Sequence, residues 1–342
     1  MSKKFDLITL GEIMLRLSPP SNERLARSDA FEKHAGGSEV NVACGAAMLG
    51  LRAAVVSKLP ENQMGTYIKN KIRFSGVSDD FLVYDSEKNS RVGIYYYESA
   101  SHPRKPAVVY DRLNSAFSNL KLEEIPEDIY SSTKVFHTSG ITLGLTENTK
   151  KIAIEMIKKF KEHGTLISLD VNFRANLWTE PEARVCMEEV LPYVDIFFAS
   201  EETCYKMFEK SGTLEEMMKS FCDEFGVQVV ATTERQIISP RKHVFGSKIY
   251  SAKEDKYYSQ PPYENIEVVD RIGSGDAYVG GMLFGMIHYE DFQKAVEFGN
   301  AMSAVKNTIP GDLPASDFKE ISSVIEGHEI KIKGGQRREM SR

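Results

Sequence analysis

A short glycine-rich segment near the C-terminal end of the chain carries the clearest chemistry. Residues 270–276 read Asp-Arg-Ile-Gly-Ser-Gly-Asp, after a short expected strand and before a long apolar stretch. Glycine lets backbone N–H groups approach an anion closely, and a helix that begins here adds the positive end of its dipole. Gly273, Ser274 and Gly275 would form an anion hole, and the Asp276 carboxylate beside them could act as a base that moves a phosphoryl group onto a hydroxyl. An ordinary helix cap is the alternative explanation.

A second pair of glycines, Gly36 and Gly37, opens another expected helix near the N-terminus. These glycines would let a ligand approach the backbone, and Asn41 in the first turn can both donate and accept hydrogen bonds toward hydroxyl groups. A plain helix start with Ser38 as its cap is the alternative interpretation. Two glycine-opened helices far apart in the sequence favour an enzyme with two substrates, an acceptor and a nucleotide.

The composition is that of a globular protein and argues against several classes of function. The 342 residues carry a formal net charge of −6, with 42% hydrophobic and 27% charged residues, which argues against nucleic acid or an anionic membrane as the main partner. No stretch approaches the ~18 apolar residues of a membrane span, and the first ten residues lack the apolar core of a signal peptide. The cysteines and histidines show no paired metal-ligand spacing. We expect a cytoplasmic protein that acts on small molecules without a transition metal, and the sequence leaves the ligands of any other metal undefined.

Apolar periodicity predicts an alternation of strands and helices, which is typical of an α/β fold with a mostly parallel central sheet. In such sheets, ligands bind at the carboxyl ends of the strands. The expected strands are 5–13, 53–59, 135–138, 166–170, 196–199 and 227–232, and the expected helices are 40–49, 65–75, 147–163, 180–190, 202–209 and 214–224.

Residues 81–112 read as short strands without a helix between them. Together with part of 14–35 they predict a small β-sheet at the ligand end of the main sheet, where it would act as a lid. Tyr95 and Tyr97 would share one face of this lid, and such an aromatic face must cover a ligand or another subunit. We expect one domain over 1–325, including the lid, and a basic tail over the residues from 326 to the end, 342.

The two glycine segments together resemble the signatures of the ribokinase-like (PfkB) carbohydrate kinases. The N-terminal segment reads AGGSEVNVACGAAMLG and the C-terminal segment reads DRIGSGDAYVGG, and the resemblance runs from about residue 5 to about residue 320. It implies a three-layer fold with a β-sheet lid, ATP and Mg²⁺ as cofactors, and a homodimer or higher homo-oligomer formed through the lid. It further implies that Asp276 deprotonates the sugar hydroxyl, that the backbone of Gly273 to Gly275 stabilises the transferred phosphate, and that Gly37 and Asn41 hold the sugar.

Two arginines bear on which sugar is bound. Arg174 follows an expected strand end in DVNFR, and Arg112 lies on the expected lid near Tyr95 and Tyr110. Two guanidinium groups beside two tyrosine hydroxyls suit a carboxylate better than a neutral sugar. The pattern is similar to that of 2-keto-3-deoxygluconate kinases, in which the residues matching Gly37 and these four side chains contact the sugar acid. A solvated Arg112 and a structural ion pair of Arg174 are the alternative interpretation.

The nucleotide side departs from the family pattern. An Asn-x-x-Glu element appears here as Ser-Glu-Glu-Thr over 200–203, and a Thr-x-Gly-x-x-Gly loop appears as a sequence without glycine that begins Thr-Thr-Glu-Arg-Gln over 232–236. This leaves two interpretations: a diverged but active nucleotide site, or a relative with little turnover. The residues that we expect to contact the nucleotide are Ser200, Thr232, Glu234, Arg271, Gly273, Gly275 and Asn307.

The leading hypothesis is ATP-dependent phosphorylation of 2-keto-3-deoxygluconate on its terminal hydroxyl, which gives 2-keto-3-deoxy-6-phosphogluconate. The alternatives are a kinase of a neutral ketose such as fructose, a kinase of 5-keto-2-deoxygluconate, and a sugar-binding protein with little turnover. A nicotinamide-dependent Rossmann enzyme is disfavoured, because no Gly-x-Gly-x-x-Gly follows the first strand.

Overall fold

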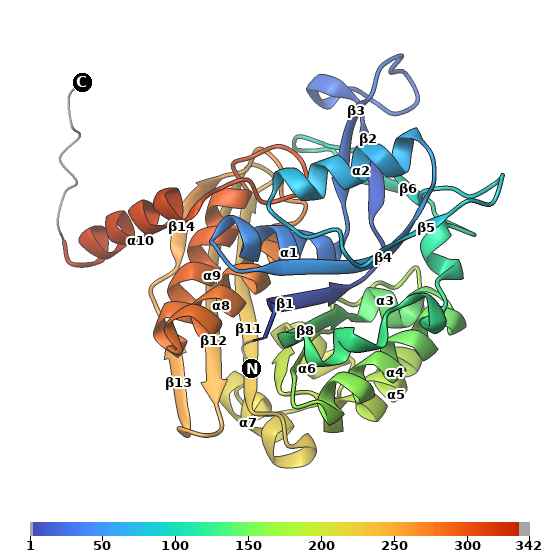
Figure 1. The fold of residues 1–342 in the computed structure, drawn as a ribbon. Helices are drawn as coiled ribbons and strands as arrows, with labels where there is room; N and C mark the ends of the chain where they lie inside the picture. The colour runs from blue at the N-terminus through green and yellow to red at the C-terminus, as the bar shows by residue number, and fades with distance from the viewer. Residues whose placement is uncertain (1–2, 335–342) are drawn as a thin grey trace.

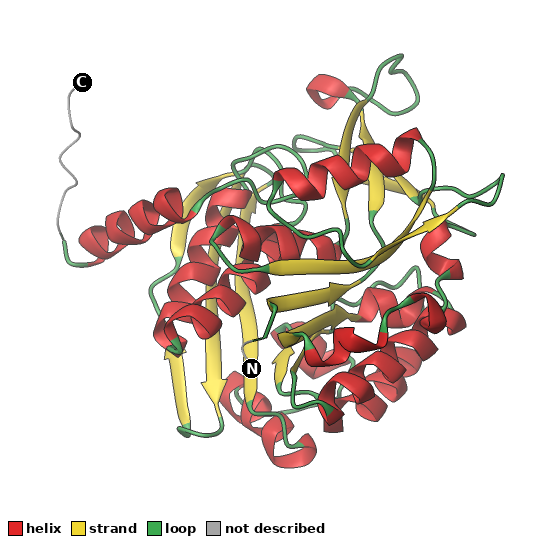
Figure 2. Cartoon of the chain, viewed as in Figure 1, coloured by secondary structure: helices red, strands yellow, loops and turns green. Residues whose placement is uncertain are grey.

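The computed structural model describes residues 3–334, which form a ten-stranded sheet covered by helices on both faces (Figures 1 and 2). The strand order is β13–β12–β11–β10–β9–β8–β1–β4–β5, and β14 also pairs with β12. The bounds are β1 (Phe5–Leu10), β4 (Ala53–Pro60), β5 (Leu82–Asp85), β8 (Thr133–Ser139), β9 (Leu166–Asp170), β10 (Ile196–Phe198), β11 (Val229–Ser239), β12 (Lys242–Ser251), β13 (Lys256–Ser259) and β14 (Tyr263–Glu267).

The strands from β5 to β11 pair in parallel, whereas β12 pairs antiparallel with β11, β13 and β14. Side chains of the central parallel strands, such as β1 and β4, are buried on both faces, as a sheet covered on both sides requires. In β1, for example, Leu7 packs into one hydrophobic core and Ile8 into the other. This alternation places the sheet between two separate cores.

The helices divide between these two cores. Apolar residues of α1 (Ser38–Met48), α2 (Gln63–Phe74), α8 (Ser274–Tyr289), α9 (Phe292–Lys306) and α10 (Phe318–Ile332) pack on one face of the sheet. The other face is covered by α3 (Gly140–Leu145), α4 (Glu147–Glu162), α5 (Glu180–Val190), α6 (Glu201–Lys206) and α7 (Leu214–Phe225). The expected three-layer α/β architecture is therefore confirmed.

A separate four-stranded sheet forms the lid, in the order β3–β2–β6–β7. Figure 1 shows it at the top right of the molecule, beyond one end of the main strands. Its strands are β2 (Met14–Ser18), β3 (Glu32–Gly36), β6 (Ile94–Glu98) and β7 (Ala107–Asp111). The lid is therefore built from two segments that are distant in the sequence, as expected.

Several expectations about the elements were wrong. The strand expected over 5–13 is two strands, because Gly11 separates β1 in the main sheet from β2 in the lid, and a Cβ at Gly11 would collide with the buried Glu39 side chain. The strand β5 lies in the main sheet rather than in the lid, and β11 continues seven residues past its expected end at Thr232 (239 − 232). The expected tail is helical up to Ile332 at the end of α10, and its residues 335–342 lie outside the described part of the chain.

None of the helices within residues 3–334 is long and apolar enough to cross a membrane.

Candidate active site

A cleft of about 410 Å³ lies between the lid and the first turns of α1 and α8. It brings together most of the residues expected to bind the sugar and the phosphate. Of these residues, Gly37, Asn41, Tyr95, Tyr110, Arg112, Arg174, Gly273, Ser274, Gly275 and Asp276 line the cleft.

The Asp276 carboxylate is held from both sides by the first turn of α1. Ser38 Oγ donates to Asp276 Oδ1 at 2.9 Å, and Asn41 Nδ2 donates to Asp276 Oδ2 at 2.7 Å. Ser38 Oγ itself accepts a bond from Asn172 Nδ2 at 2.7 Å, so its single proton points to Asp276. Burial raises the pKa of Asp276, and the bonds from Asn41 and Ser38 and the nearby Arg174 oppose that rise. The carboxylate is therefore fixed in orientation and more basic than an ordinary aspartate.

The start of α8, called the anion site below, offers backbone amides to an anion, and the Ser274 amide expected among them is already engaged. Ser274 N donates to the Arg271 carbonyl at 3.2 Å and is therefore engaged. The amides of Gly273, Gly275 and Asp276 donate to no acceptor within residues 3–334. Unpaired first-turn amides are donors to an anion. Gly273 has φ +80°, and a Cβ there would lie 2.2 Å from the Asp312 carbonyl, so this turn requires glycine.

Asp170 and Asn172 at the end of β9 extend the site. The Asn172 amide donates to Asp170 Oδ1 at 3.0 Å, and Asn172 adopts φ +36°, a conformation that carries strain outside glycine. Burial and the nearby Asp276 raise the pKa of Asp170 to about 7. A second carboxyl group that titrates near neutral pH therefore lies beside the expected base.

The two arginines are not equivalent. Arg112 is buried, and its Nε donates to Glu12 Oε2 at 2.8 Å while its Nη2 contacts the same oxygen. Its charge is therefore largely balanced by the protein. Arg174 is exposed in the cleft, donates to the Phe173 carbonyl, and forms no ion pair within the described residues. Of the two expected clamp residues, only Arg174 has an unbalanced charge.

The buried carboxylate of Asp312 contacts or adjoins two residues that were expected to bind the sugar, Tyr95 and Gly36. The Tyr95 hydroxyl donates to Asp312 Oδ2, so one expected sugar donor is already engaged. A Cβ at Gly36 would lie 2.2 Å from Asp312 Oδ2, and Gly36 does not line the cleft. The lack of a side chain at Gly36 therefore makes room for a buried carboxylate, and contact between Gly36 and the sugar stays a prediction.

A network of charged groups around Asp270 holds the segment that leads into the start of α8. Arg16 from the lid contacts both Asp270, at 2.5 Å, and Asp312, at 3.2 Å. Lys306 is 1% exposed, and its Nζ donates to the carbonyls of Asp270 and Ile309 at 3.3 and 3.0 Å. This network ties the anion site to the lid and to the end of α9.

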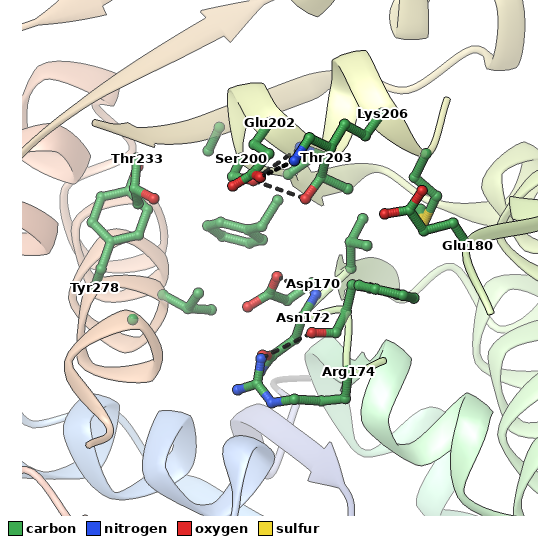
Figure 3. Close-up of a pocket in the computed structure, with 18 residues that line it drawn as sticks. Asp170, Asn172, Arg174, Glu180, Ser200, Glu202, Thr203, Lys206, Thr233 and Tyr278 are labelled. Carbon is green, nitrogen blue, oxygen red and sulfur yellow. Dashed lines mark hydrogen bonds and ion pairs between the residues drawn. The ribbon is translucent and has the colours of Figure 1, made fainter. Parts of the chain in front are cut away.

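A second cavity of about 420 Å³ adjoins the first and shares Asp170, Asn172, Arg174 and Gly275 with it. Figure 3 shows Asp170, Asn172 and Arg174 on one side and Ser200, Thr203 and Glu202 on the other, with Thr233 and Tyr278 at the end. Ser200 caps α6 by accepting from Thr203 N. The two cavities give adjoining spaces for two substrates on either side of Gly275.

The pfkB family model of carbohydrate kinases matches residues 4–315 of the chain. The chain belongs to this family. The kinase is 33% identical over 327 residues to 2-dehydro-3-deoxygalactonokinase of Haloferax volcanii, covering 96% of this chain and 98% of that protein. It is 27% identical to 5-dehydro-2-deoxygluconokinase of Clostridium perfringens, covering 89% and 87%.

Solved structures agree with this assignment. The crystal structure of 2-dehydro-3-deoxygluconokinase from Thermotoga maritima superposes with a TM-score of 0.89 and 34% identity, covering 94% of this chain and 98% of that one. A putative ribokinase II from E. coli in complex with ATP and Mg²⁺ shares the fold, with a TM-score of 0.82 and 21% identity over 95% and 100% of the chains. The ribokinase-like fold and the carbohydrate kinase class are thus confirmed.

The residues expected to bind the nucleotide lie in different places. Ser200 lines the second cavity, and Arg271 lines the first with Gly273 and Gly275. Thr232 is buried, and neither it nor Glu234 lines either cavity. Asn307 is also buried, and its carbonyl accepts from the amides of Val269 and Asp270. Nucleotide contact by Thr232, Glu234 and Asn307 stays a prediction.

Sequence reasoning missed several residues of the kinase cleft, among them Asp170, Asn172, Arg235 and Asp312. The pair Asp-x-Asn at a strand end was a usable signal for the first two. For Arg235 and Asp312 the sequence offers no local signal, because their partners are distant in the chain.

Proposed function

We propose that this kinase transfers the terminal phosphoryl group of ATP to the terminal hydroxyl of a 2-keto-3-deoxy sugar acid, with 2-keto-3-deoxygluconate as the first candidate. The observation that carries the proposal is that one cavity contains an oriented carboxylate, unpaired helix amides and an unbalanced guanidinium, namely Asp276, the start of α8 and Arg174. A base, an anion site and a carboxylate receptor are the three parts that this reaction needs.

Asp276 would take the proton of the terminal hydroxyl as the hydroxyl oxygen attacks the terminal phosphorus atom. The new O–P bond forms while the bond to the ADP oxygen breaks, and the electron pair leaves with ADP. Ser38 and Asn41 keep the carboxylate aimed at the hydroxyl, and the free amides of Gly273, Gly275 and Asp276 would face the charge that develops on the phosphoryl oxygens. The burial that raises the pKa of Asp276 makes it a better proton acceptor.

Arg174 would hold the carboxylate of the substrate. Its guanidinium has no acidic partner in the described chain and lies near enough to Asp170 and Asp276 to oppose the rise in both of their pKa values. Arg112 would contribute hydrogen bonds rather than net charge, because Glu12 balances it. A single unbalanced cation is still sufficient to favour an acid over a neutral sugar.

Magnesium fits the donor set of the second cavity without a dedicated cage. No group of three or more His, Cys, Asp or Glu side chains within residues 3–334 could enclose a metal ion. Mg²⁺ instead keeps waters and binds one or two carboxylates together with substrate phosphates, and Asp170 and Glu202 supply carboxylates there. When bound, Mg²⁺ neutralises charge on the phosphates of ATP.

The relatives differ in the stereochemistry and position of the keto group of their named substrates. The galactonate epimer of the first candidate and 5-keto-2-deoxygluconate are therefore second candidates, and both would present a carboxylate to Arg174. A neutral ketose would leave that guanidinium unused.

The test is ADP formation by the purified kinase with 2-keto-3-deoxygluconate, its galactonate epimer, 5-keto-2-deoxygluconate, fructose or no sugar. Turnover with the 2-keto-3-deoxy acids at a kcat/KM at least ~10-fold above fructose supports the proposal. Turnover confined to fructose refutes acid recognition while keeping the kinase. Sugar binding without turnover on any member of the panel refutes the catalytic proposal.

A further inference from the structure

The segment expected to form the nucleotide loop is a paired strand instead. Residues 229–239 run antiparallel to β12, with Thr233 opposite Ser247, Glu234 opposite Gly246 and Arg235 opposite Phe245. Pairing with β10 ends at Ala231, so the rest of this strand pairs only with β12, and it contains no glycine. It therefore does not form a glycine turn around a phosphate chain, and its side chains become the main candidates for phosphate contact.

One face of this strand does reach the active site. Alternate residues of a strand share a face, and Thr233 lines the second cavity while Arg235 lines the cleft with Asp276. Arg235 Nη2 donates to Ser274 Oγ at 3.0 Å, within the anion segment of α8. The guanidinium carbon also lies 6.0 Å from the centre of the Phe245 ring, the residue opposite it in the ladder. These contacts hold the side chain in place beside the helix start.

A second guanidinium, that of Arg271, lines the same part of the cleft. Neither Arg235 nor Arg271 forms an ion pair with a carboxylate of residues 3–334, and the Arg271 side chain bonds to the neutral hydroxyl of Tyr97. Partial desolvation of the guanidinium in the cleft and the nearby Arg271 lower the pKa of Arg235, although the residue as a whole is exposed. Two unpaired cations held together repel one another, and an anion that contacts both removes that cost.

We propose that Arg235 and Arg271 form a guanidinium clamp for the phosphate chain of the nucleotide, in place of loop amides. The inference rests on the proposed kinase function and adds the residues that bind its phosphate donor. The bond of Arg235 uses one of five guanidinium N–H donors, so four remain for phosphate oxygens. A phosphate is favoured over the substrate carboxylate because Arg235 is bonded to Ser274 in the first turn of α8, beside the free amides of Gly275 and Asp276.

The experiment compares Arg235→Gln, Arg271→Gln and the double variant with Arg235→Lys and with Arg241→Gln. Arg241 is an exposed arginine on the same hairpin and outside the cleft, which makes its variant a matched control. The Kd of MgATP is measured by calorimetry without sugar, and the Kd of the sugar acid without nucleotide. The kcat/KM for ATP is measured with the best acceptor of the panel, and Tm is measured for every variant.

We expect Arg235→Gln and Arg271→Gln each to weaken MgATP binding by about 10- to 100-fold, with sugar acid binding within about threefold of the parent. Arg235→Lys should keep part of the affinity, Arg241→Gln should match the parent, and Tm should not change. Added guanidinium should partly restore the turnover of Arg235→Ala, which a purely structural role would not allow.

Unchanged MgATP affinity in the double variant would overturn the clamp. A loss of sugar acid binding instead of MgATP binding would also overturn it, and would assign the two arginines to the carboxylate. Because MgATP binding is measured without sugar, these outcomes stay distinct from failure of the proposed function, which would appear as absent turnover by the parent kinase.

Discussion

Replacing Asp276 by Asn is the direct test of the base. Asn keeps the size of the side chain but cannot accept the hydroxyl proton, so kcat should fall by about 10²- to 10⁴-fold. Binding of the sugar should change little, because the asparagine has nearly the same shape and its carbonyl oxygen can still accept one of the two bonds that Ser38 and Asn41 donate. Single-turnover kinetics and calorimetry on the same preparation check both statements. A variant that keeps near-parental kcat would rule out Asp276 as the base.

The acid limb of the pH profile should report the same carboxylate. A protonated Asp276 cannot accept a proton, and burial raises its pKa, so kcat/KM should begin to fall at a higher pH than for an aspartate with its ordinary pKa. Arg174 lowers the pKa of Asp276 and of Asp170, so Arg174→Met should move the acid limb to still higher pH. The test is to measure kcat/KM of the parent and of Arg174→Met between pH 4 and pH 9. An acid limb at the same pH in both would show that Arg174 does not affect the pKa of Asp170 or Asp276.

Substitution of Arg174 should affect catalysis, whereas substitution of Arg112 should affect stability. Arg174→Met should lower kcat/KM for the sugar acid by about 10- to 100-fold with little effect on stability, because its guanidinium is exposed and unpaired. Arg112→Met should lower the free energy of unfolding by about 3–5 kcal/mol, because Glu12 would be left charged and buried. Urea unfolding and steady-state kinetics on both variants separate the two effects. Equal losses of stability would contradict the assignment.

For single residues, the sequence was sufficient to predict a role when that role depends on neighbours in the same segment. Gly273 and Asp276 are identifiable because a glycine turn and a first-turn carboxylate lie within one short segment. The roles of Arg112 and Tyr95 depend on Glu12 and Asp312, which are 100 and 217 residues away. No local pattern reveals such partners, so the sequence named these side chains but not what they contact.

Among the elements, the end of α9 supports the anion segment through one lysine. Lys306→Met would leave the Asp270 and Ile309 carbonyls without their donor and the carboxylates of Asp270 and Asp312 with one fewer cation. We expect the free energy of unfolding to fall by about 3 kcal/mol and kcat to fall by about 10- to 100-fold as the segment shifts.

The control for Lys306 is Lys294→Met on the same helix, whose ion pair with Glu297 is partly exposed and should contribute less than about 1 kcal/mol. Denaturant unfolding and steady-state kinetics on both variants provide the comparison. A Lys306→Met variant with parental kcat would show that the anion segment holds its shape without the lysine.

Element boundaries were predictable where periodicity and caps agree. The expected ranges of β9 and α5 match the structure, and α5 starts with a capping box between Thr179 and Glu182. The extension of β11 was not predictable, because its outer half is exposed and is held by pairing with β12 rather than by burial. The hairpin that carries Arg235 therefore appears only when the partner strand is known.

For the whole molecule, the site exists because the fold joins the two ends of the chain. The helices α1 and α8 pack against each other on one face of the sheet, and the hydrogen bonds from Ser38 and Asn41 to Asp276 span 238 and 235 residues. Alternation of strands and helices was enough to predict the fold class. The meeting of these two helix starts follows from the strand order, which periodicity does not determine.

The lid offers the last prediction, that two copies of the chain associate through it. Strand β7 is an edge strand with all five residues exposed. Val108 and Tyr110 line the cleft, so alternation turns Val109, which is 54% exposed, to the opposite face. An exposed apolar edge of this kind favours pairing with another chain. We expect a dimer at micromolar concentration, and we expect Val109→Lys to shift it to monomer without changing the cleft.

Sedimentation velocity measures the assembly state, and Val185→Lys is the matched control because Val185 is 69% exposed on α5, away from the lid. A parent that sediments as a monomer would contradict the lid dimer. A Val109→Lys variant that stays dimeric would place the interface on another surface. A monomeric Val109→Lys variant with lowered kcat/KM would show more than assembly, because Val108 and Tyr110 lie on the same strand and pairing at this edge would then fix the wall of the cleft that contacts the sugar.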